Sequence, residues 1–220
     1  MHLKETINHA ALLIQRRQYA KAYLELQKAL ELQQRMLQAS HGGSDDCNKL
    51  TEEASPAMSL LGIAPLIPCG GKTAWPDDPL FMFPLVIHAS ESCVNDTAYA
   101  CSFCATAAFN MGLACHLYVD QTGVSSQDRK RYFRLAQAFY QQAFHMSKNL
   151  VLPVLQMALC NNLVEVAIEQ NDWRSARFWA SLFVKWTHDQ PRKVSGDLWA
   201  HFVEASSFYI SLLSRANCST

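Results

Sequence analysis

Small residues recur at the same separations in three stretches of this 220-residue sequence, and this spacing limits the fold more than any other feature. In the first stretch, Ala10 is followed 12, 16 and 19 positions later by Ala22, Leu26 and Ala29. In the third, Val164 is followed at the same three separations by Ala176, Ala180 and Phe183. The middle stretch, with Gly112, Ala136, Tyr140 and Ala143, matches if about twelve residues around 120–131 are an insertion. Because small residues let two helices cross closely, this grid predicts three helical hairpins.

Helical periodicity and capping residues place the hairpins along the chain. Apolar residues at helical spacing predict two helices within 3–38, with a break near Arg17 and Gln18. Further helices are predicted over 96–119, 127–147, 153–170, 173–187 and 197–213. The run from Ser125 to Asp128 resembles a capping box at the start of one of them. We therefore expect an all-α chain of antiparallel hairpins that ends in a C-terminal capping helix.

Residues 40–89 interrupt the helical pattern after the first hairpin. Six of the eight prolines and five of the eight glycines lie between His41 and Pro84, which excludes a long helix there. The stretch 40–100 is also acidic, with eight carboxylates against two basic side chains, and either a solvated linker or a loop lying against the basic helices fits this charge. Leu80–Ile87 is too apolar to be solvated and contains a proline. We expect it to be extended and attached to the helical body, for example as a lone edge strand.

The grid resembles the tetratricopeptide repeat, a helix–turn–helix unit with a small residue in its first helix and an alanine, aromatic, alanine series in its second. Met111–Gly112 and Leu163–Val164 stand where the family has Leu-Gly. The sequence departs from the family at its early tryptophan, replaced by Thr6, Ala108 and Cys160, and at the closing proline of the first repeat, replaced by Gln34. The resemblance covers 3–38 and 97–187. It implies an α-solenoid in which residues 1–220 form one domain with a long loop insertion.

An asparagine stands two residues before each small grid residue, at Asn8, Asn110 and Asn162. The resemblance implies that this position faces a concave groove where extended peptides bind. A side-chain amide has two donors and one acceptor oxygen, so a row of three could hydrogen-bond a peptide backbone. The alternative is that these amides bond carbonyls of the adjacent helix and hold the repeats in register without any ligand.

Other groove positions implied by the resemblance include Phe109, Leu113, His116, Asn161 and Glu165. Of all the groove positions, Lys4 alone is cationic, whereas chaperone-binding members of the family hold a carboxylate with several Lys and Arg. A mixed apolar and amide groove suits a neutral peptide or the chain's own Leu80–Ile87 segment. The expected function is therefore a non-enzymatic protein–protein interaction scaffold with a peptide or partner helix in its groove.

The eight cysteines suggest a rival function. The chain is long and apolar enough to fold without disulfides, so reduced thiols are expected. Cys101 and Cys104 have zinc-ligand spacing, with Cys93, Cys115, His88 and His116 nearby in sequence, but a second pair at that spacing is missing. Both also fit a helical apolar pattern as small core residues. A cysteine-based zinc or redox protein is the alternative, and we expect neither metal nor cofactor.

Enzymatic motifs are incomplete. Gly70–Thr73 resembles the end of a phosphate-binding loop, but Leu66 stands where its first glycine is required. No serine or cysteine lies in a recognisable nucleophile turn. We expect no catalytic residues.

Charge and hydropathy bear on the remaining partner classes. The chain has 19 basic and 19 acidic residues. Arg129, Lys130, Arg131 and Arg134, interleaved with Tyr132 and Phe133, suggest RNA binding as a lesser alternative, but four charges form too small a footprint without a second stripe. Nucleic acid is therefore not expected as a partner. Without a continuous apolar run of membrane length or a secretory signal, the expected location is cytoplasmic or nuclear.

Overall fold

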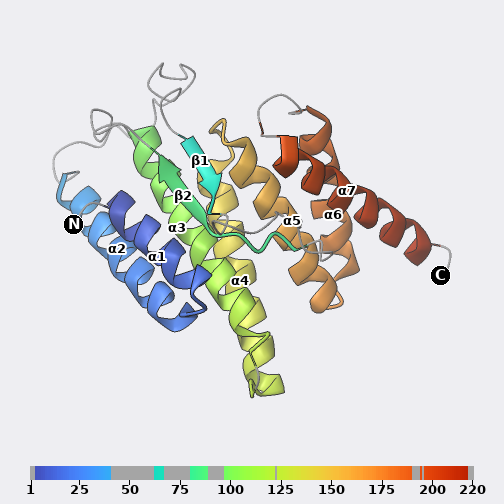
Figure 1. The fold of residues 1–220 in the computed structure, drawn as a ribbon, viewed down its shortest axis with the longest axis horizontal. Coiled ribbons are helices and arrows are strands. Elements are labelled where there is room, and N and C mark those ends of the chain that lie inside the picture. The colour runs from blue at the N-terminus through green and yellow to red at the C-terminus, as the bar shows by residue number, and fades with distance from the viewer. Residues whose placement is uncertain are drawn as a thin grey trace.

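The structure is a computed structural model that describes residues 3–40, 62–66, 80–88, 97–121, 123–189, 194 and 196–217. These residues form seven helices: α1 (Leu3–Gln15), α2 (Tyr19–Ser40), α3 (Thr97–Tyr118), α4 (Ser126–Ser147), α5 (Pro153–Glu169), α6 (Trp173–Asp189) and α7 (Gly196–Asn217). They also form two short strands, β1 (Gly62–Pro65) and β2 (Leu85–His88). The predicted helical content is confirmed in these ranges (Figure 1). The sequence suggests that Leu80–Ile87 could form a lone edge strand. This is wrong, because β2 pairs with β1.

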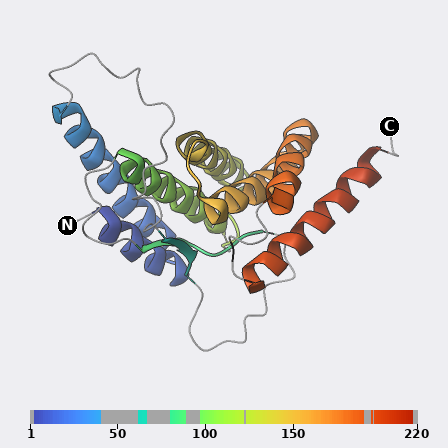
Figure 2. The same cartoon turned by 90° about the horizontal axis from the view of Figure 1, so that it is seen from above.

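The helices pack as hairpins in chain order. α1 packs on α2, α3 on α4 and α5 on α6, and α2–α3 and α4–α5 contacts join successive hairpins. The first helices also contact each other, α1 with α3 and α3 with α5. Residues 80–88 cross the face formed by these three first helices (Figure 2).

The first and third hairpins turn with the same backbone geometry. Arg17 and Asn171, each seven residues after the small grid residue, have left-handed φ angles of 59° and 57°. In both turns the amide of this residue bonds the carbonyl three residues back, and the next amide bonds the carbonyl five residues back. This is the Schellman arrangement that ends many helices. The two hairpins thus share the register that the spacing predicts.

The middle hairpin differs in length. Helix α4 begins ten residues before Ala136, whereas α2 begins three residues before Ala22. About half of the predicted insertion, residues 126–131, is therefore helix rather than loop, because the local sequence propagates the helix back to the predicted cap. The cap itself is confirmed, since the Asp128 amide donates to Ser125 Oγ over 3.1 Å. The extended hairpin projects beyond the neighbouring turns (Figure 1).

Gly112 lets α3 and α4 cross closely. A Cβ added there would lie 2.7 Å from two ring carbons of Tyr140 and 3.2 Å from the Ala136 carbonyl oxygen. Tyr140 is fully buried and hydrogen-bonded to Asn162, so its ring has little room to move. The predicted contact between Gly112 and Ala136 is therefore confirmed.

Helix α3 runs through the middle of the array. Its Tyr99–Tyr118 window is long and apolar enough to cross a membrane by length and composition, although it contains no long continuous apolar run. In the structure, 78% of the 18-residue window that meets this criterion is buried inside the molecule, as in the core helix of a packed array.

Replacing Gly112 by alanine should destabilise the protein by about 1–3 kcal/mol, because the methyl group overpacks the α3–α4 crossing by more than the helix propensity of alanine offsets. Urea unfolding monitored by circular dichroism measures this. Gly196→Ala is the matched control, since an added Cβ there meets no atom within 4 Å. Equal stability of the Gly112→Ala variant and the wild type would contradict the close crossing.

Candidate functional site

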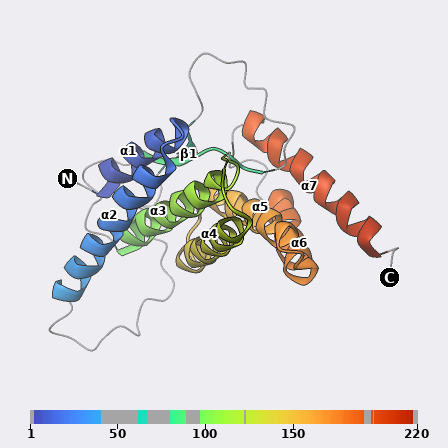
Figure 3. The ribbon, with the colours of Figure 1, turned by 90° about the horizontal axis from the view of Figure 1, so that it is seen from below.

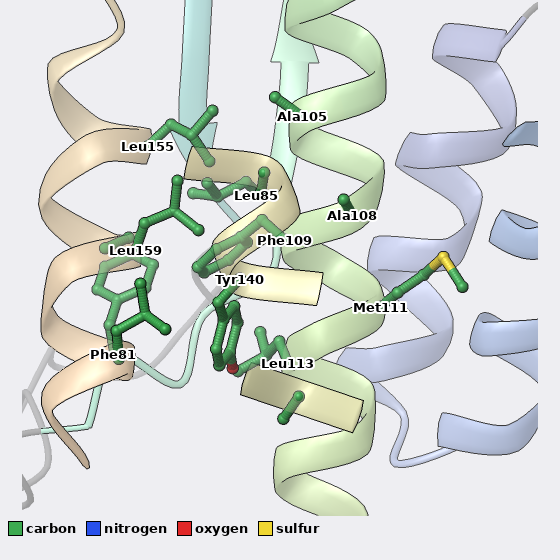
Figure 4. Packing of buried hydrophobic residues seen from close by; sticks show 14 of the residues in the cluster. Phe81, Leu85, Ala105, Ala108, Phe109, Met111, Leu113, Tyr140, Leu155 and Leu159 are labelled. Atoms are coloured by element: carbon green, nitrogen blue, oxygen red, sulfur yellow. The ribbon is translucent and has the colours of Figure 1, made fainter. Parts of the chain in front are cut away.

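The extended segment 80–88 is embedded in the helical face rather than attached to its surface. The side chains of Phe81, Leu85 and Ile87 are 0% exposed and belong to the main hydrophobic cluster. Phe81 and Leu85 lie between α5, with Leu155 and Leu159, and the Phe109 side of α3 (Figure 4). An extended segment buried in this way must find partners for its backbone amides and carbonyls.

Two buried asparagines supply partners in the same manner. Asn110 Nδ2 donates to the Leu85 carbonyl over 2.8 Å, and its Oδ1 accepts from the Leu85 amide over 2.9 Å. Asn162 Nδ2 donates to the Phe81 carbonyl over 3.1 Å, and its Oδ1 accepts from the Phe81 amide over 3.0 Å. Each side-chain amide thus pairs with both polar groups of one backbone residue, as a neighbouring β-strand would.

The third asparagine repeats the arrangement at the other end of the segment. Asn8 Nδ2 donates to the Ile87 carbonyl over 3.0 Å, and Asn8 Oδ1 accepts from the Ile87 amide over 2.8 Å. We call Asn8, Asn110 and Asn162 the asparagine row. Because they lie on α1, α3 and α5, the segment runs opposite to the order of the hairpins, from α5 to α1. None of the three bonds a carbonyl of an adjacent helix in the hydrogen bonds described.

Strand β2 uses its two edges differently. Leu85 and Ile87 present their polar backbone groups to the asparagine row. The other edge pairs antiparallel with β1, in the register Ala64↔Val86 and Gly62↔His88, and the Leu66 amide extends the pairing to the Pro84 carbonyl. Side-chain amides therefore take the place of a second neighbouring strand.

Aromatic rings enclose Phe81. Its ring stacks on Phe202 of α7, with centroids 5.4 Å apart and planes 22° apart. Phe109 and His201 lie at 6.2 and 6.1 Å. The start of α7 therefore lies beside the beginning of the segment (Figure 3).

The remaining predicted groove residues lie behind or beside the asparagine row. Leu113 is 0% exposed in the core. Asn161 Nδ2 donates to Asn162 Oδ1 over 3.3 Å, while Glu165 accepts a 2.6 Å hydrogen bond from Tyr209 and so ties α5 to α7. The ring of Phe109 lies against the segment, with its centroid 6.2 Å from that of Phe81. Of the positions that the resemblance assigns to the groove, Asn161 thus supports the asparagine row, Leu113 belongs to the core, and Glu165 binds α7.

His116 extends this support. The Tyr140 hydroxyl accepts from Asn162 Nδ2 over 3.2 Å and lies 3.4 Å from His116 Nδ1. Burial, with a smaller effect of Arg129, lowers the pKa of His116 to about 4. The imidazole is therefore neutral at neutral pH and acts as a packed hydrogen-bonding group behind the asparagine row.

The four cysteines in the described part of the chain are free thiols. Burial raises the pKa of Cys104 to about 11 and that of Cys115 to about 12, so neither is a ready nucleophile. Within the described residues, no three His, Cys, Asp or Glu side chains gather as a metal site would require. Cys47, Cys69, Cys93 and Cys218, like Gly70–Thr73, lie outside the described residues.

Several residues of this site carry no local signal that predicts them. Phe202 and His201 appear in the sequence as an ordinary stretch of amphipathic helix, yet they enclose Phe81. β1 consists of four residues in a Gly/Pro-rich stretch. Its pairing with β2 depends on a contact between segments about twenty residues apart, which propensity does not reveal.

Asn110→Ala should destabilise the protein by about 2–4 kcal/mol, because it leaves the buried amide and carbonyl of Leu85 without partners. Asn8→Ala should cost about 1 kcal/mol, since Asn8 and its bonds to Ile87 are only partly buried. Urea unfolding of both variants measures the difference. Equal costs would mean that burial does not set the strength of the row.

Acidification should destabilise the fold through His116. Its folded pKa of about 4 lies below the ordinary value of 6.5, so the unfolded chain takes up the proton first and stability is lost as pH falls from 6.5 towards 4. Between pH 7 and pH 5 this loss is on the order of 2 kcal/mol. His116→Gln should remove that part of the pH dependence in urea unfolding at the two pH values. An unchanged difference between them would show that His116 titrates normally.

Comparison of the chain with family models, curated proteins and solved structures found no match in any of the three. The function is therefore argued from the geometry of the asparagine row and the segment it holds.

Proposed function

We propose that this chain is a non-enzymatic protein–protein interaction scaffold, built as a tetratricopeptide-like α-solenoid, that binds an extended peptide in the groove of α1, α3 and α5. Residues 80–88 act as an occupant of that groove supplied by the chain itself. The observation that carries this proposal is the asparagine row, which holds three backbone residues of one extended segment by paired hydrogen bonds.

The row recognises groups that every peptide has. An amide and a carbonyl are common to all residues except proline, so these bonds tolerate many sequences. Selectivity then comes from the side chains that point into the core, at the positions of Phe81, Leu85 and Ile87. A partner suited to this groove is an uncharged extended peptide with large apolar residues at the same spacing as Phe81, Leu85 and Ile87.

The cis segment, residues 80–88, competes with any such partner from within the same chain. Its covalent connection gives an effective concentration of about millimolar, so a free peptide at lower concentration is largely excluded while the segment is in place. Binding of a partner therefore requires release of residues 80–88, which makes the segment autoinhibitory. The opposite case is a permanent structural strand that never leaves.

An exchange experiment separates these two cases. Recognition sequences for a site-specific protease are inserted after Thr73 and after Glu91, so that cleavage converts the cis segment into a noncovalent ligand. A fluorescein-labelled peptide of residues 78–90 is then added, and anisotropy is followed. We expect the cleaved protein to bind the labelled peptide and the uncleaved protein to bind at least 100-fold less at the same concentration.

Matched controls test the recognition mode. A peptide carrying Leu85→Asp should not bind, because the carboxylate would be buried. A cleaved Asn110→Ala, Asn162→Ala double variant should bind at least tenfold more weakly; if it does not fold, Asn8→Ala takes its place with a smaller loss. Cleaved protein that stays folded without exchanging the peptide, or that unfolds on cleavage, would mark the segment as permanent.

A further inference from the structure

The extra helical turns of the middle hairpin form a step beside the start of α2. A hollow of about 300 Å³ lies in this step, bordered by Arg131 and by the rings of Tyr19, Tyr23, Tyr118 and Tyr132. The rings of Tyr118 and Tyr132 are 4.6 Å apart at 51°. All four tyrosines are partly exposed, so their rings are accessible from the hollow.

Two further hollows continue the first. One of about 300 Å³ shares Tyr19 and Tyr118 with it and adds Arg17 from the α1–α2 turn and Lys21 from the start of α2. The other, about 460 Å³, shares Arg131 and adds Lys130 and Arg134 from the outer face of α4. Cations from two different hairpins thus border three hollows that share lining residues, and the hollow that shares residues with both others is lined by the four tyrosines.

Electrostatic effects on the tyrosines agree with this placement. The pKa of Tyr19 is raised by burial, while Arg17 opposes the rise and Asp120 adds to it. Burial likewise raises the pKa of Tyr23, and Arg131 opposes that rise. Arg17 and Arg131 therefore each act on a tyrosine of the shared hollow, although 114 positions separate them in the sequence.

Most of these cations form no close ion pair in the described part of the chain, although Asp128 borders the same hollow as Lys130, Arg131 and Arg134. Arg129, next to the hollows, lies 3.9 Å from Asp120 and 3.8 Å from Glu169. Among the described residues, no carboxylate lies within 4 Å of Arg17, Lys21, Lys130, Arg131 or Arg134. The second stripe that a nucleic-acid footprint requires is absent from the sequence around Arg129–Arg134 but is supplied by the α1–α2 turn.

Arg17 is an unfavourable residue for its own turn. It has a left-handed φ of 59°, and the equivalent turn between α5 and α6 has Asn171, a residue that tolerates this conformation better. Its side chain is exposed and borders one of the hollows, so it is accessible to a ligand bound there.

We propose that the step, which we call the tyrosine–arginine surface, binds single-stranded nucleic acid. Tyrosine rings stack on bases of any sequence, and the flanking Arg and Lys side chains neutralise phosphates. An acidic peptide would use the same cations but has no need of four tyrosines around one hollow. The surface lies at the turns of the hairpins, apart from the groove that holds residues 80–88, so this proposal does not depend on the proposed function.

Fluorescence anisotropy with the full chain tests the proposal. The probes are fluorescein-labelled U12, labelled dT12 and a labelled twelve-residue polyglutamate, each at several salt concentrations. U12 or dT12 should bind with a log–log salt slope of about −0.7 per phosphate contacted. Arg17→Gln, Lys21→Gln, Arg131→Gln should weaken binding at least tenfold and bring the slope about two units closer to zero.

Two further variants test the separate parts of the proposal. One removes a stacking ring, and the other controls for unspecific charge attraction. Tyr132→Leu should weaken binding about 5- to 100-fold with an unchanged salt slope, because it removes a stacking ring and no charge. The control Lys28→Gln, Arg35→Gln, Lys185→Gln removes three exposed cations elsewhere and should stay within twofold of wild type. Circular dichroism verifies that each variant is folded.

Three results would overturn the proposal. The first is no binding of U12 or dT12 at low salt. The second is an equal loss in the control triple variant, which would indicate diffuse charge attraction. The third is polyglutamate binding as tight as that of the oligonucleotides, which would assign the surface to an acidic protein partner instead.

Discussion

Every backbone amide and carbonyl that leaves water needs a hydrogen-bond partner, and this requirement governs the middle of the molecule. Residues 80–88 bury three large apolar side chains against the helices, and they can do so only because their backbone is satisfied on both edges. β1 serves one edge of β2, and the asparagine row serves the other edge and continues to Phe81. Without the row, the apolar gain would be offset by unpaired polar groups.

The same bonds join the hairpins to one another. Asn8, Asn110 and Asn162 belong to three successive hairpins, yet all three bind one continuous segment. The segment therefore connects α1, α3 and α5 through one continuous backbone. Among these three helices, direct contacts join α1 to α3 and α3 to α5. The Phe81–Phe202 stack extends this connection to α7.

Helix packing and the asparagine row are physically linked through Tyr140. Gly112 leaves space for the Tyr140 ring against α3, and the hydroxyl of that ring then reaches Asn162. Gly112, which sets the crossing distance of α3 and α4, thus also helps to orient the Asn162 amide through Tyr140. His116 lies on the far side of the same hydroxyl, which explains why it is buried and neutral instead of facing the groove.

Local chemistry is sufficient to predict the helices, the hairpin pairing, the Ser125 cap and the alignment of three asparagines, because periodicity, capping and spacing act over a few turns of helix. It also indicates that Leu80–Ile87 is extended and cannot remain in water. Other features require distant parts of the chain to meet: the β1–β2 pairing, the Phe202 ring over Phe81, and the hollow lined by tyrosines of α2, α3 and α4. These contacts arise from how the hairpins stack and how far α3 and α4 extend. Such non-local packing leaves no periodic mark in the residues that make it, which is why Asn161, Glu165 and His116, which the resemblance assigned to a groove, lie behind or beside the asparagine row.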